Sequence, residues 1–229
     1  MVFTIPLPSR AMKVEDAPKH QGLRRRLIEE LRQKGIHNEQ VLKAMMEVPR
    51  HLFFDSAFLD FAYADKAFPI QAGQTISQPY TVAFQSDLLA AKPRMHVLEI
   101  GTGSGYQAAV LSRMGMRVWT IERQRALYKR SQEIFKALRL PVKGFYGDGY
   151  KGLPSFAPFD RVLVTCGAPE LPQKLIEQMG EGGVMVVPIG AGSEQVMTRI
   201  EKTAEGEIIQ SEHGTFRFVP MLQDKSKAS

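Results

Sequence analysis

The sequence predicts an α/β fold: a doubly wound, mainly parallel seven-stranded sheet with an antiparallel C-terminal strand and extra N-terminal helices. Three observations predict it. Apolar, strand-like runs alternate with helical segments from about residue 97 to residue 188. A glycine-rich turn follows the first of these runs, as in the first βα unit of many parallel sheets. After residue 190, two apolar segments separated by a short turn indicate an antiparallel pair.

Length and composition favour one folded domain. The chain has 229 residues, of which 44% are hydrophobic and 24% charged, as is typical of a globular protein with a single core. We expect a flexible arm over residues 1–20, which contain three prolines, one domain over 21–223, and a polar tail over 224–229. The expected parts of the domain are N-terminal helices with a hydroxyl-bearing loop (21–92), a cofactor-binding core (93–190) and C-terminal strands (191–223).

Two amphipathic helices are expected before Pro49. Apolar residues at helical spacing define them: Leu23, Leu27, Ile28 and Leu31 in the first, and Val41, Leu42, Met45 and Val48 in the second. Gly35 is expected to end the first helix and Asn38 to cap the second. The arginines at 24–26 favour a solvated helix face with nearby glutamates rather than a nucleic-acid contact.

The glycine-rich turn follows the apolar run 97–100, with glycines at every second position: Gly101, Gly103 and Gly105. Glycine permits positive φ angles and close approach of a ligand to the backbone. The spacing does not fit a dinucleotide fingerprint, since Tyr106 stands where the third glycine is needed, nor a phosphate-binding P-loop, which ends in Gly-Lys-Ser/Thr. A turn for a small polar cofactor is therefore predicted, and a glycine-rich turn that binds nothing stays the alternative.

The remaining elements are expected at regular intervals. We expect strands over 117–121, 142–146, 159–165 and 184–188, then the antiparallel segments 195–202 and 208–219. Helices are expected after Pro79, after the glycine turn, over 124–138 and over 172–179. The glycines at 180, 182 and 183 are expected to form a turn before the fifth strand.

Polar residues lie at the ends of four predicted parallel strands: Glu99, Glu122, Asp148 and Thr165. The carboxyl ends of parallel strands form one edge of the sheet, where ligands of such folds bind. An acidic residue at the end of the second strand, Glu122, is placed to accept hydrogen bonds from ribose hydroxyls. A surface carboxylate paired with Arg123 or Arg125 is the alternative.

A second polar segment lies upstream, in the loop over residues 73–79. It carries two hydroxyls, Thr75 and Ser77, between Gly73 and Pro79. The loop leads into a helix directly before the first predicted strand, so it can bring both hydroxyls to the cofactor edge. The alternative is a loop that only caps its own helix.

Two of these segments resemble known families. The turn with Glu99 and its alternating glycines resembles the first motif of S-adenosylmethionine-dependent methyltransferases with a Rossmann-like sheet. The loop 73–79 resembles the signature of the protein-L-isoaspartate O-methyltransferases, and the segments 44–50, 99–106, 147–149 and 217–220 agree with that family. The resemblance covers roughly residues 22 to 222 and leaves the N-terminal arm unmatched.

The resemblance implies a protein repair reaction. Enzymes of this family transfer a methyl group from S-adenosylmethionine to the free α-carboxylate of an L-isoaspartyl residue, leaving S-adenosylhomocysteine and an ester that closes to a succinimide. A carboxylate is already an anion at neutral pH, so an SN2 transfer needs alignment rather than a general base or a metal.

The resemblance also implies roles for particular residues. Ser77 is the expected catalytic residue, and Ser77 and Val219 are expected to bind substrate. The expected cofactor-binding residues are Gln74, Thr75, Ile76, Ser77, Glu99, Gly101, Thr102, Gly103, Ser104, Gly105, Glu122, Arg123, Asp148, Gly149 and Thr165.

The expected partners are isoaspartyl-containing proteins and peptides, with no nucleic acid, no membrane and no metal, and we expect a cytoplasmic monomer. The single Cys166 excludes an internal disulfide. The net charge of +6 and the pI of about 9.4 make an RNA methyltransferase the enzymatic alternative. Residues 165–169, Thr-Cys-Gly-Ala-Pro, lack the Asn-Pro-Pro-Tyr type of base-binding motif that would favour it. A non-catalytic binding protein with the same fold is a further alternative, which the hydroxyl loop disfavours.

Overall fold

The computed structural model describes residues 15–226. Residues 1–14 of the predicted arm and 227–229 of the predicted tail lie outside the described residues. No helix within the described part is long and apolar enough to cross a membrane.

The centre of the molecule is a seven-stranded sheet of order β5-β4-β3-β6-β7-β8-β9. Its strands are β3 (His96–Ile100), β4 (Arg117–Glu122), β5 (Lys143–Tyr146), β6 (Phe159–Val164), β7 (Met179–Ile189), β8 (Gln195–Lys202) and β9 (Ile208–Phe216). The five strands β3 to β7 are parallel, and β8 runs antiparallel to both of its neighbours. The predicted mainly parallel sheet is confirmed, and the order of its last strands, which the sequence left open, is a simple meander.

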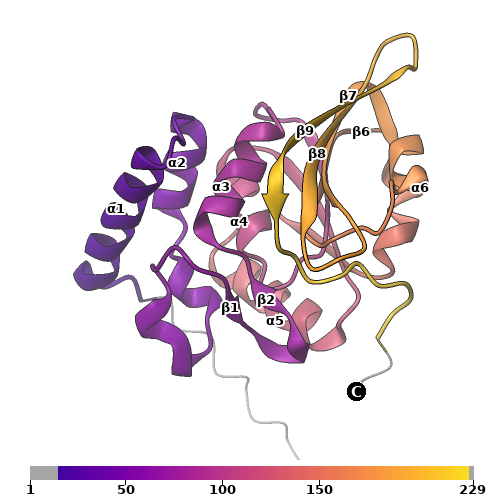
Figure 1. Cartoon of the computed structure of the whole chain (residues 1–229). Coiled ribbons are helices and arrows are strands. Elements are labelled where there is room, and N and C mark those ends of the chain that lie inside the picture. Colours follow the sequence, from indigo (N-terminus) through magenta and orange to yellow (C-terminus); the bar gives the residue numbers. More distant parts are fainter. Residues whose placement is uncertain (1–14, 227–229) are drawn as a thin grey trace, which may run out of the picture.

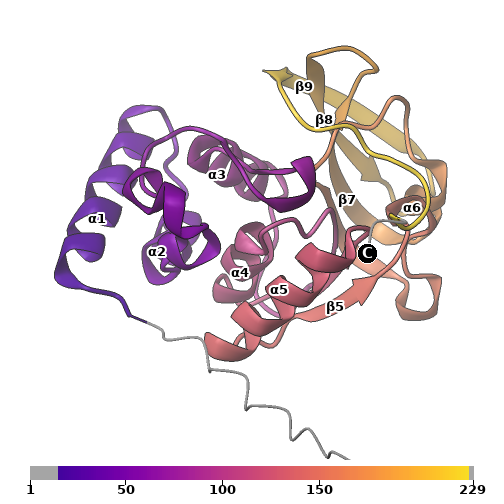
Figure 2. The same ribbon diagram turned by 90° about the horizontal axis from the view of Figure 1, so that it is seen from below.

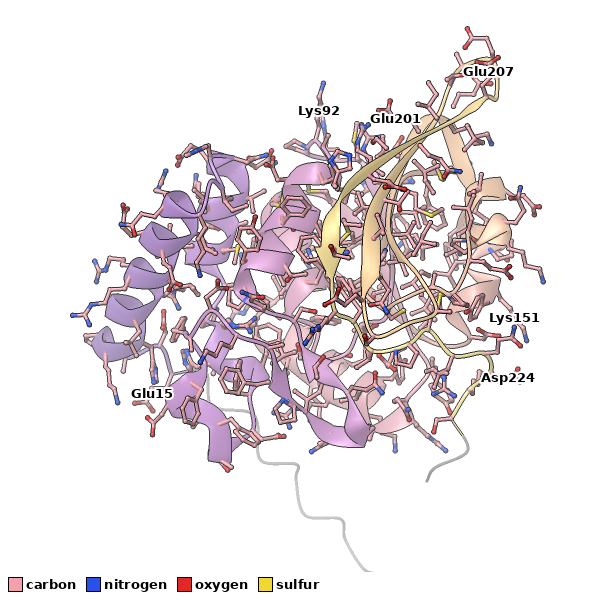
Figure 3. The ribbon with its side chains drawn as sticks, in the orientation of Figure 1. Glu15, Lys92, Lys151, Glu201, Glu207 and Asp224 are labelled. Atoms are coloured by element: carbon pink, nitrogen blue, oxygen red, sulfur yellow. The ribbon has the colours of Figure 1, made fainter. Side chains whose placement is uncertain are left out.

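The chain reverses its direction across the sheet after β5, because β6 returns to the other side of β3. A crevice forms outside the carboxyl ends of the strands at such a switch point. In Figure 3, Lys92, just before β3, lies at the upper edge of the molecule and Asp224 at the right of its lower half. The lower edge is the carboxyl edge, since Arg123, directly after β4, donates to the Asp224 carbonyl at 2.9 Å.

Helices cover the two faces of the sheet unequally. The helices are α1 (Pro18–Gln33), α2 (Glu39–Glu47), α3 (Pro79–Leu88), α4 (Tyr106–Arg113), α5 (Arg125–Ala137) and α6 (Gln173–Glu177). Figures 1 and 2 show α3, α4 and α5 on one face with α1 and α2 outside them, and α6 on the other face. Alternate strand residues supply the two cores: Val97 packs into the first and Leu98 into the second.

A small hairpin lies at the lower edge in Figure 1. It pairs β1 (Phe68–Pro69) with β2 (Thr75–Ile76) in antiparallel register, and a 3-10 turn over Gln71–Gly73 connects them. The hairpin displays the hydroxyl loop on the carboxyl-edge side of α3. Four further short 3-10 helices in the described residues span Arg50–Phe53, Ser56–Phe61, Gly149–Lys151 and Pro154–Phe156.

The predicted helix signals at the N-terminal side are confirmed. The Asn38 side chain accepts hydrogen bonds from the backbone N–H groups of Gln40 and Val41, and Gly35 follows α1 with a φ of +95°. The first helix, however, begins at Pro18, inside the segment predicted as an arm. The prediction that residues 24–26 form a solvated helix face was wrong for Arg24. This residue is 6% exposed and donates hydrogen bonds to Asp16 and to the Tyr63 hydroxyl.

Two boundaries differ from prediction in the C-terminal half. The segment 180–183, expected as a turn, belongs to β7, where it forms an irregularity opposite the step from Phe159 to Arg161. Between the paired positions there, Asp160 of β6 faces the four residues 180–183 of β7, and Gly182 takes up part of the extra chain with a φ of +67°. The last predicted strand ends at Phe216, and the segment after it leaves the ladder to cross the carboxyl edge.

Candidate functional site

The glycine turn connects β3 to α4 at the carboxyl edge. Gly101 and Gly105 have φ angles of +95° and +91°, which residues other than glycine rarely adopt. A Cβ atom on Gly101 would lie 2.7 Å from the Thr165 hydroxyl oxygen, and one on Gly105 would lie 2.9 Å from the Phe135 ring. The turn thus brings bare backbone close to β6 and α5, as predicted for a cofactor cradle.

Glu122, at the end of β4, is tied to this turn. One carboxylate oxygen accepts from Gly103 N at 2.8 Å, and the other accepts from Gln124 N at 2.7 Å. The side chain is 4% exposed, and burial raises its pKa although the two N–H groups oppose the shift. Arg123 donates instead to the Asp224 and Gln223 carbonyls, so the predicted alternative of a surface pair with Arg123 does not occur.

Glu99 supports the turn from behind. Its side chain is completely buried and accepts a hydrogen bond from the Thr120 hydroxyl, whose oxygen lies 2.6 Å from that of Thr102. Burial raises the pKa of Glu99 to about 8, and the nearby Glu122 charge adds to the rise. This chain of polar groups connects the interior of the sheet to Thr102 in the turn.

A cavity opens in front of the turn and encloses about 750 Å³ of empty space, part of it open to solvent. The predicted site residues in its wall are Gln74, Thr75, Ile76, Ser77, Gly101, Thr102, Gly103, Ser104, Glu122, Arg123, Gly149, Thr165 and Val219. Segments from 74 to 219 of the chain therefore meet around one space.

Three predicted residues stand outside this wall: Glu99, Gly105 and Asp148. Glu99 lies behind the turn, and Gly105 precedes α4 and packs toward α5. Asp148 accepts a hydrogen bond from Tyr150 N at 2.9 Å and so caps the short 3-10 helix Gly149–Lys151. Their assignment as cofactor contacts stays a prediction.

Sequence reasoning missed several wall residues: Val82, Ile100, Tyr106, Gln107, Ile121, Cys166, Pro220, Met221 and Leu222. Most of them lie next to predicted site residues, at the ends of β3 and β4 or in the first turns of α3 and α4. Residues 220–222 differ, because they reach the cavity only when the chain after β9 folds back. Gly167 N donates to Val219 O and Met221 N to Gly167 O, both at 2.8 Å, and this pairing holds the segment.

Cys166 is a neutral part of this wall. Burial raises its pKa to about 12, and the charge of Glu122 acts in the same direction. A thiol with such a pKa is protonated at neutral pH and is a poor nucleophile. The wall therefore offers no activated nucleophile at this position.

The hydroxyl loop closes one side of the cavity. Ile76 is buried and anchors the loop, while Thr75 is exposed and Ser77 half-buried. The N-cap of α3 is Gln78, which makes no side-chain capping bond and donates to Asp65 instead. The alternative of a loop that only caps its own helix is thus not supported.

A second groove lies beside the cavity, between α3 and the segment that contains the end of β9. Aromatic side chains form its floor: Phe84 lies 5.1 Å from Phe216 and 5.9 Å from Tyr80, measured between ring centroids. The groove and the cavity share four lining residues, Thr75, Ser77, Thr165 and Val219. We call these four residues the junction. A group bound in the cavity and a chain bound in the groove would meet there.

One cluster of metal-type ligands occurs in residues 15–226, at Asp16, His20 and His51. Asp16 already pairs with Arg24, and the two ring nitrogens of His51 contact the Tyr63 hydroxyl and the Glu15 carbonyl, each at 2.8 Å. None of the three lines the cavity or the groove.

Comparison with known proteins agrees with this geometry. The family model described as protein-L-isoaspartate(D-aspartate) O-methyltransferase matches residues 22–226. The protein-L-isoaspartate O-methyltransferase of Cytophaga hutchinsonii is 54% identical over 209 residues, which are 91% of this chain and 95% of the relative. That of Flavobacterium johnsoniae is 54% identical over 214 residues, which are 93% of this chain and 100% of the relative.

Two solved structures are also similar. One protein-L-isoaspartate O-methyltransferase has a TM-score of 0.78 at 30% identity over 86% of this chain, which spans 65% of that structure's chain. A Plasmodium falciparum structure, described as a protein-L-isoaspartate O-methyltransferase in complex with S-adenosyl-L-homocysteine, has a TM-score of 0.75 at 25% identity. That comparison covers 90% of this chain and 99% of the other.

Proposed function

The chain belongs to the protein-L-isoaspartate(D-aspartate) O-methyltransferase family, and from this premise we propose that methyl transfer takes place at the junction of the cavity and the groove. It is an S-adenosylmethionine-dependent methyltransferase of isoaspartyl residues. The observation that supports the proposed place is that Thr75, Ser77, Thr165 and Val219 line both spaces.

The residues of the cavity fit S-adenosylmethionine. The buried Glu122 carboxylate keeps lone pairs beyond its two backbone bonds and can accept from ribose hydroxyls. Apolar atoms of Ile100, Ile121 and Met221 give a flat base an apolar surrounding. When bound, this cofactor supplies an electrophilic methyl group on a positively charged sulfur.

The acceptor needs orientation rather than activation. The α-carboxylate of an isoaspartyl residue is ionised at neutral pH, so no side chain has to remove a proton. In our proposal the Ser77 hydroxyl donates to that carboxylate and orients one oxygen for in-line attack, with Thr75 beside it. The Thr165 hydroxyl is not assigned to the acceptor. Its oxygen lies 2.7 Å from the Gly101 carbonyl and 2.9 Å from the Ile100 carbonyl, so its one hydrogen is already used in keeping the turn against β6.

The groove suits an extended peptide. One of its sides is the edge of the sheet formed by residues 213–216 of β9 and the segment that follows. The backbone of an edge strand can pair with an added strand, and the aromatic floor can take apolar side chains. We include Val219 as a substrate contact because it lies at the junction with its carbonyl fixed by Gly167.

We further propose that the protein acts as a monomer in the cytoplasm, without nucleic acid or membrane partners. One chain supplies every wall of the cavity and of the groove described above, which supports action as a monomer.

The test is a paired peptide assay. The protein is incubated with S-adenosylmethionine labelled in the methyl group and with two peptides that differ only in an isoaspartyl or a normal aspartyl residue. We expect label to enter the isoaspartyl peptide alone. Cofactor binding without transfer, or equal labelling of both peptides, would contradict the proposal.

A further inference from the structure

We propose that Arg50 is a positioning residue for methyl transfer: it holds the backbone of Ser77 in place and supplies a buried positive charge behind the junction. This inference rests on the function proposed above, because it concerns the alignment of an anionic acceptor. Arg50 ends the segment 44–50 that resembles the family, but the resemblance implied no role for its side chain.

Arg50 is the first residue of a 3-10 helix over Arg50–Phe53 and is completely buried. Its Nε atom donates to the Ala62 carbonyl at 3.0 Å, and its Nη2 atom donates to the Ser77 carbonyl at 2.9 Å. The guanidinium carbon lies 4.5 Å from the ring centroid of Tyr106 and 5.3 Å from that of Phe54. The cation therefore packs against two rings and bonds the hydroxyl loop directly.

The charge of Arg50 is not neutralised by a direct partner. Among the ion pairs of the described residues, none includes Arg50. Burial lowers its pKa to about 10, so the guanidinium is still a cation at neutral pH. Carbonyl oxygens and ring faces stabilise this cation but leave its net positive charge in a medium of low dielectric constant.

Asp65, whose charge acts to raise the pKa of Arg50, is hydrogen-bonded to other groups. Its carboxylate accepts from the Lys34 ammonium at 2.6 Å, from Gln78 Nε2 at 3.0 Å and from Tyr80 N at 2.8 Å. These bonds fix the start of α3, directly after the loop. The hydroxyl loop is thus fixed on its Ser77 carbonyl by Arg50 and on the following residues by Asp65.

The place of the bond gives it a consequence for the reaction. Ser77 is one of the four junction residues, and fixing its carbonyl restricts the direction in which its hydroxyl points. Displacement of a reacting group by about 1 Å can lower a rate by roughly 100-fold. A positive potential from behind the loop also favours a carboxylate at the junction over a neutral side chain.

The experiment compares Arg50→Met, Arg50→Lys and a matched control, Arg24→Met. Arg24 is also buried and hydrogen-bonded, but it contacts Asp16 and Tyr63 rather than the loop. For each variant we would measure the melting temperature, the Kd for S-adenosylhomocysteine, and kcat and KM for the isoaspartyl peptide.

We expect Arg50→Met to lower kcat by roughly 10- to 100-fold, as misalignment of a reacting group does, with the Kd for S-adenosylhomocysteine within about threefold of wild type. Arg50→Lys should give an intermediate kcat, because one ammonium retains the charge but cannot bond both carbonyls in the same fixed geometry. Arg24→Met should lower the melting temperature and keep kcat within about twofold.

Three results would overturn the inference: a folded Arg50→Met or Arg50→Lys variant with wild-type kcat, a kcat loss in Arg24→Met equal to that in Arg50→Met, or a parallel loss of cofactor affinity. If Arg50→Met does not fold, Arg50→Lys alone decides, since a normal kcat would contradict a role for both bonds. A wild-type protein that fails the paired peptide assay would refute the proposed function itself, and this inference with it.

Discussion

The carboxylate of Glu122 accepts a hydrogen bond from the backbone N–H of Gly103 at 2.8 Å, so the end of β4 and the glycine turn after β3 form one unit. The bond fixes an acceptor group beside bare backbone in the wall of the cavity. It also opposes the rise in the pKa of Glu122 that burial causes.

Replacement of Glu122 by glutamine should weaken cofactor binding. Each hydrogen bond from a ribose hydroxyl to a charged acceptor contributes about 1.5–3 kcal/mol, so we expect the Kd for S-adenosylhomocysteine to rise by roughly 10-fold or more. Isothermal titration calorimetry measures the change. Glu177→Gln, an exposed carboxylate on α6, is the control and should leave the Kd unaltered. An unchanged Kd in Glu122→Gln would show that the Glu122 carboxylate does not contribute to cofactor binding.

Replacement of Ser77 by alanine separates binding from transfer. The hydroxyl lies at the junction, so its loss should lower kcat for the isoaspartyl peptide by roughly 10-fold, the value of one hydrogen bond to a charged group. The Kd for S-adenosylhomocysteine should change by less than about twofold, because in our proposal the hydroxyl donates to the acceptor carboxylate rather than to the cofactor. Ser155→Ala, exposed and away from both spaces, is the control. A normal kcat in Ser77→Ala would show that another group orients the acceptor.

The parallel sheet and the glycine turn could be predicted because local signals determine them. Alternation of apolar runs with helical segments located every parallel strand, and the glycine spacing located the turn. The acidic ends of β3 and β4 were also visible in the sequence. The sequence could not show that the two carboxylates have different surroundings. Glu122 lines the cavity, whereas Glu99 is completely buried behind the turn.

Features that depend on distant segments could not be predicted. Residues 220–222 enter the cavity wall through pairing with Gly167, more than fifty positions earlier in the chain. Arg50 carries no signal of burial, because an arginine beside Pro49 is ordinarily expected at the surface. Gly182 was predicted to lie in a turn, and its positive φ is typical of one. The residue nevertheless belongs to β7, where the pairing with β6 is irregular.

Glu99 predicts a dependence of stability on pH. Its pKa is about 8 in the folded protein, well above the ordinary value of 4.5, so the folded state binds more protons than the unfolded state between these values. Stability from this group is therefore fully present at pH below about 4.5 and decreases as the pH rises toward 8. Glu99→Gln, which resembles the protonated form, should lose less stability over this range than wild type.

Urea unfolding of wild type and Glu99→Gln at pH 5.5, 6.5 and 7.5 measures this difference. Glu47→Gln, an exposed carboxylate at the end of α2, should follow the wild-type profile. Equal slopes of unfolding free energy against pH for wild type and Glu99→Gln would contradict a protonated Glu99 in the folded state.

Truncation of Phe84 should affect the peptide and not the cofactor. Its ring stands between Tyr80 and Phe216 in the floor of the groove, and it does not line the cavity. We expect Phe84→Leu to raise KM for the isoaspartyl peptide severalfold, because a smaller and non-aromatic side chain leaves part of the apolar contact unmade. The Kd for S-adenosylhomocysteine should be unaltered.

The control is Phe156→Leu, which removes an aromatic ring at a partly exposed position on the opposite face of the sheet and should leave KM unchanged. A KM equal to that of wild type in Phe84→Leu would place the peptide outside the groove, and a raised KM with a raised cofactor Kd would indicate a general disturbance of α3 rather than a peptide contact.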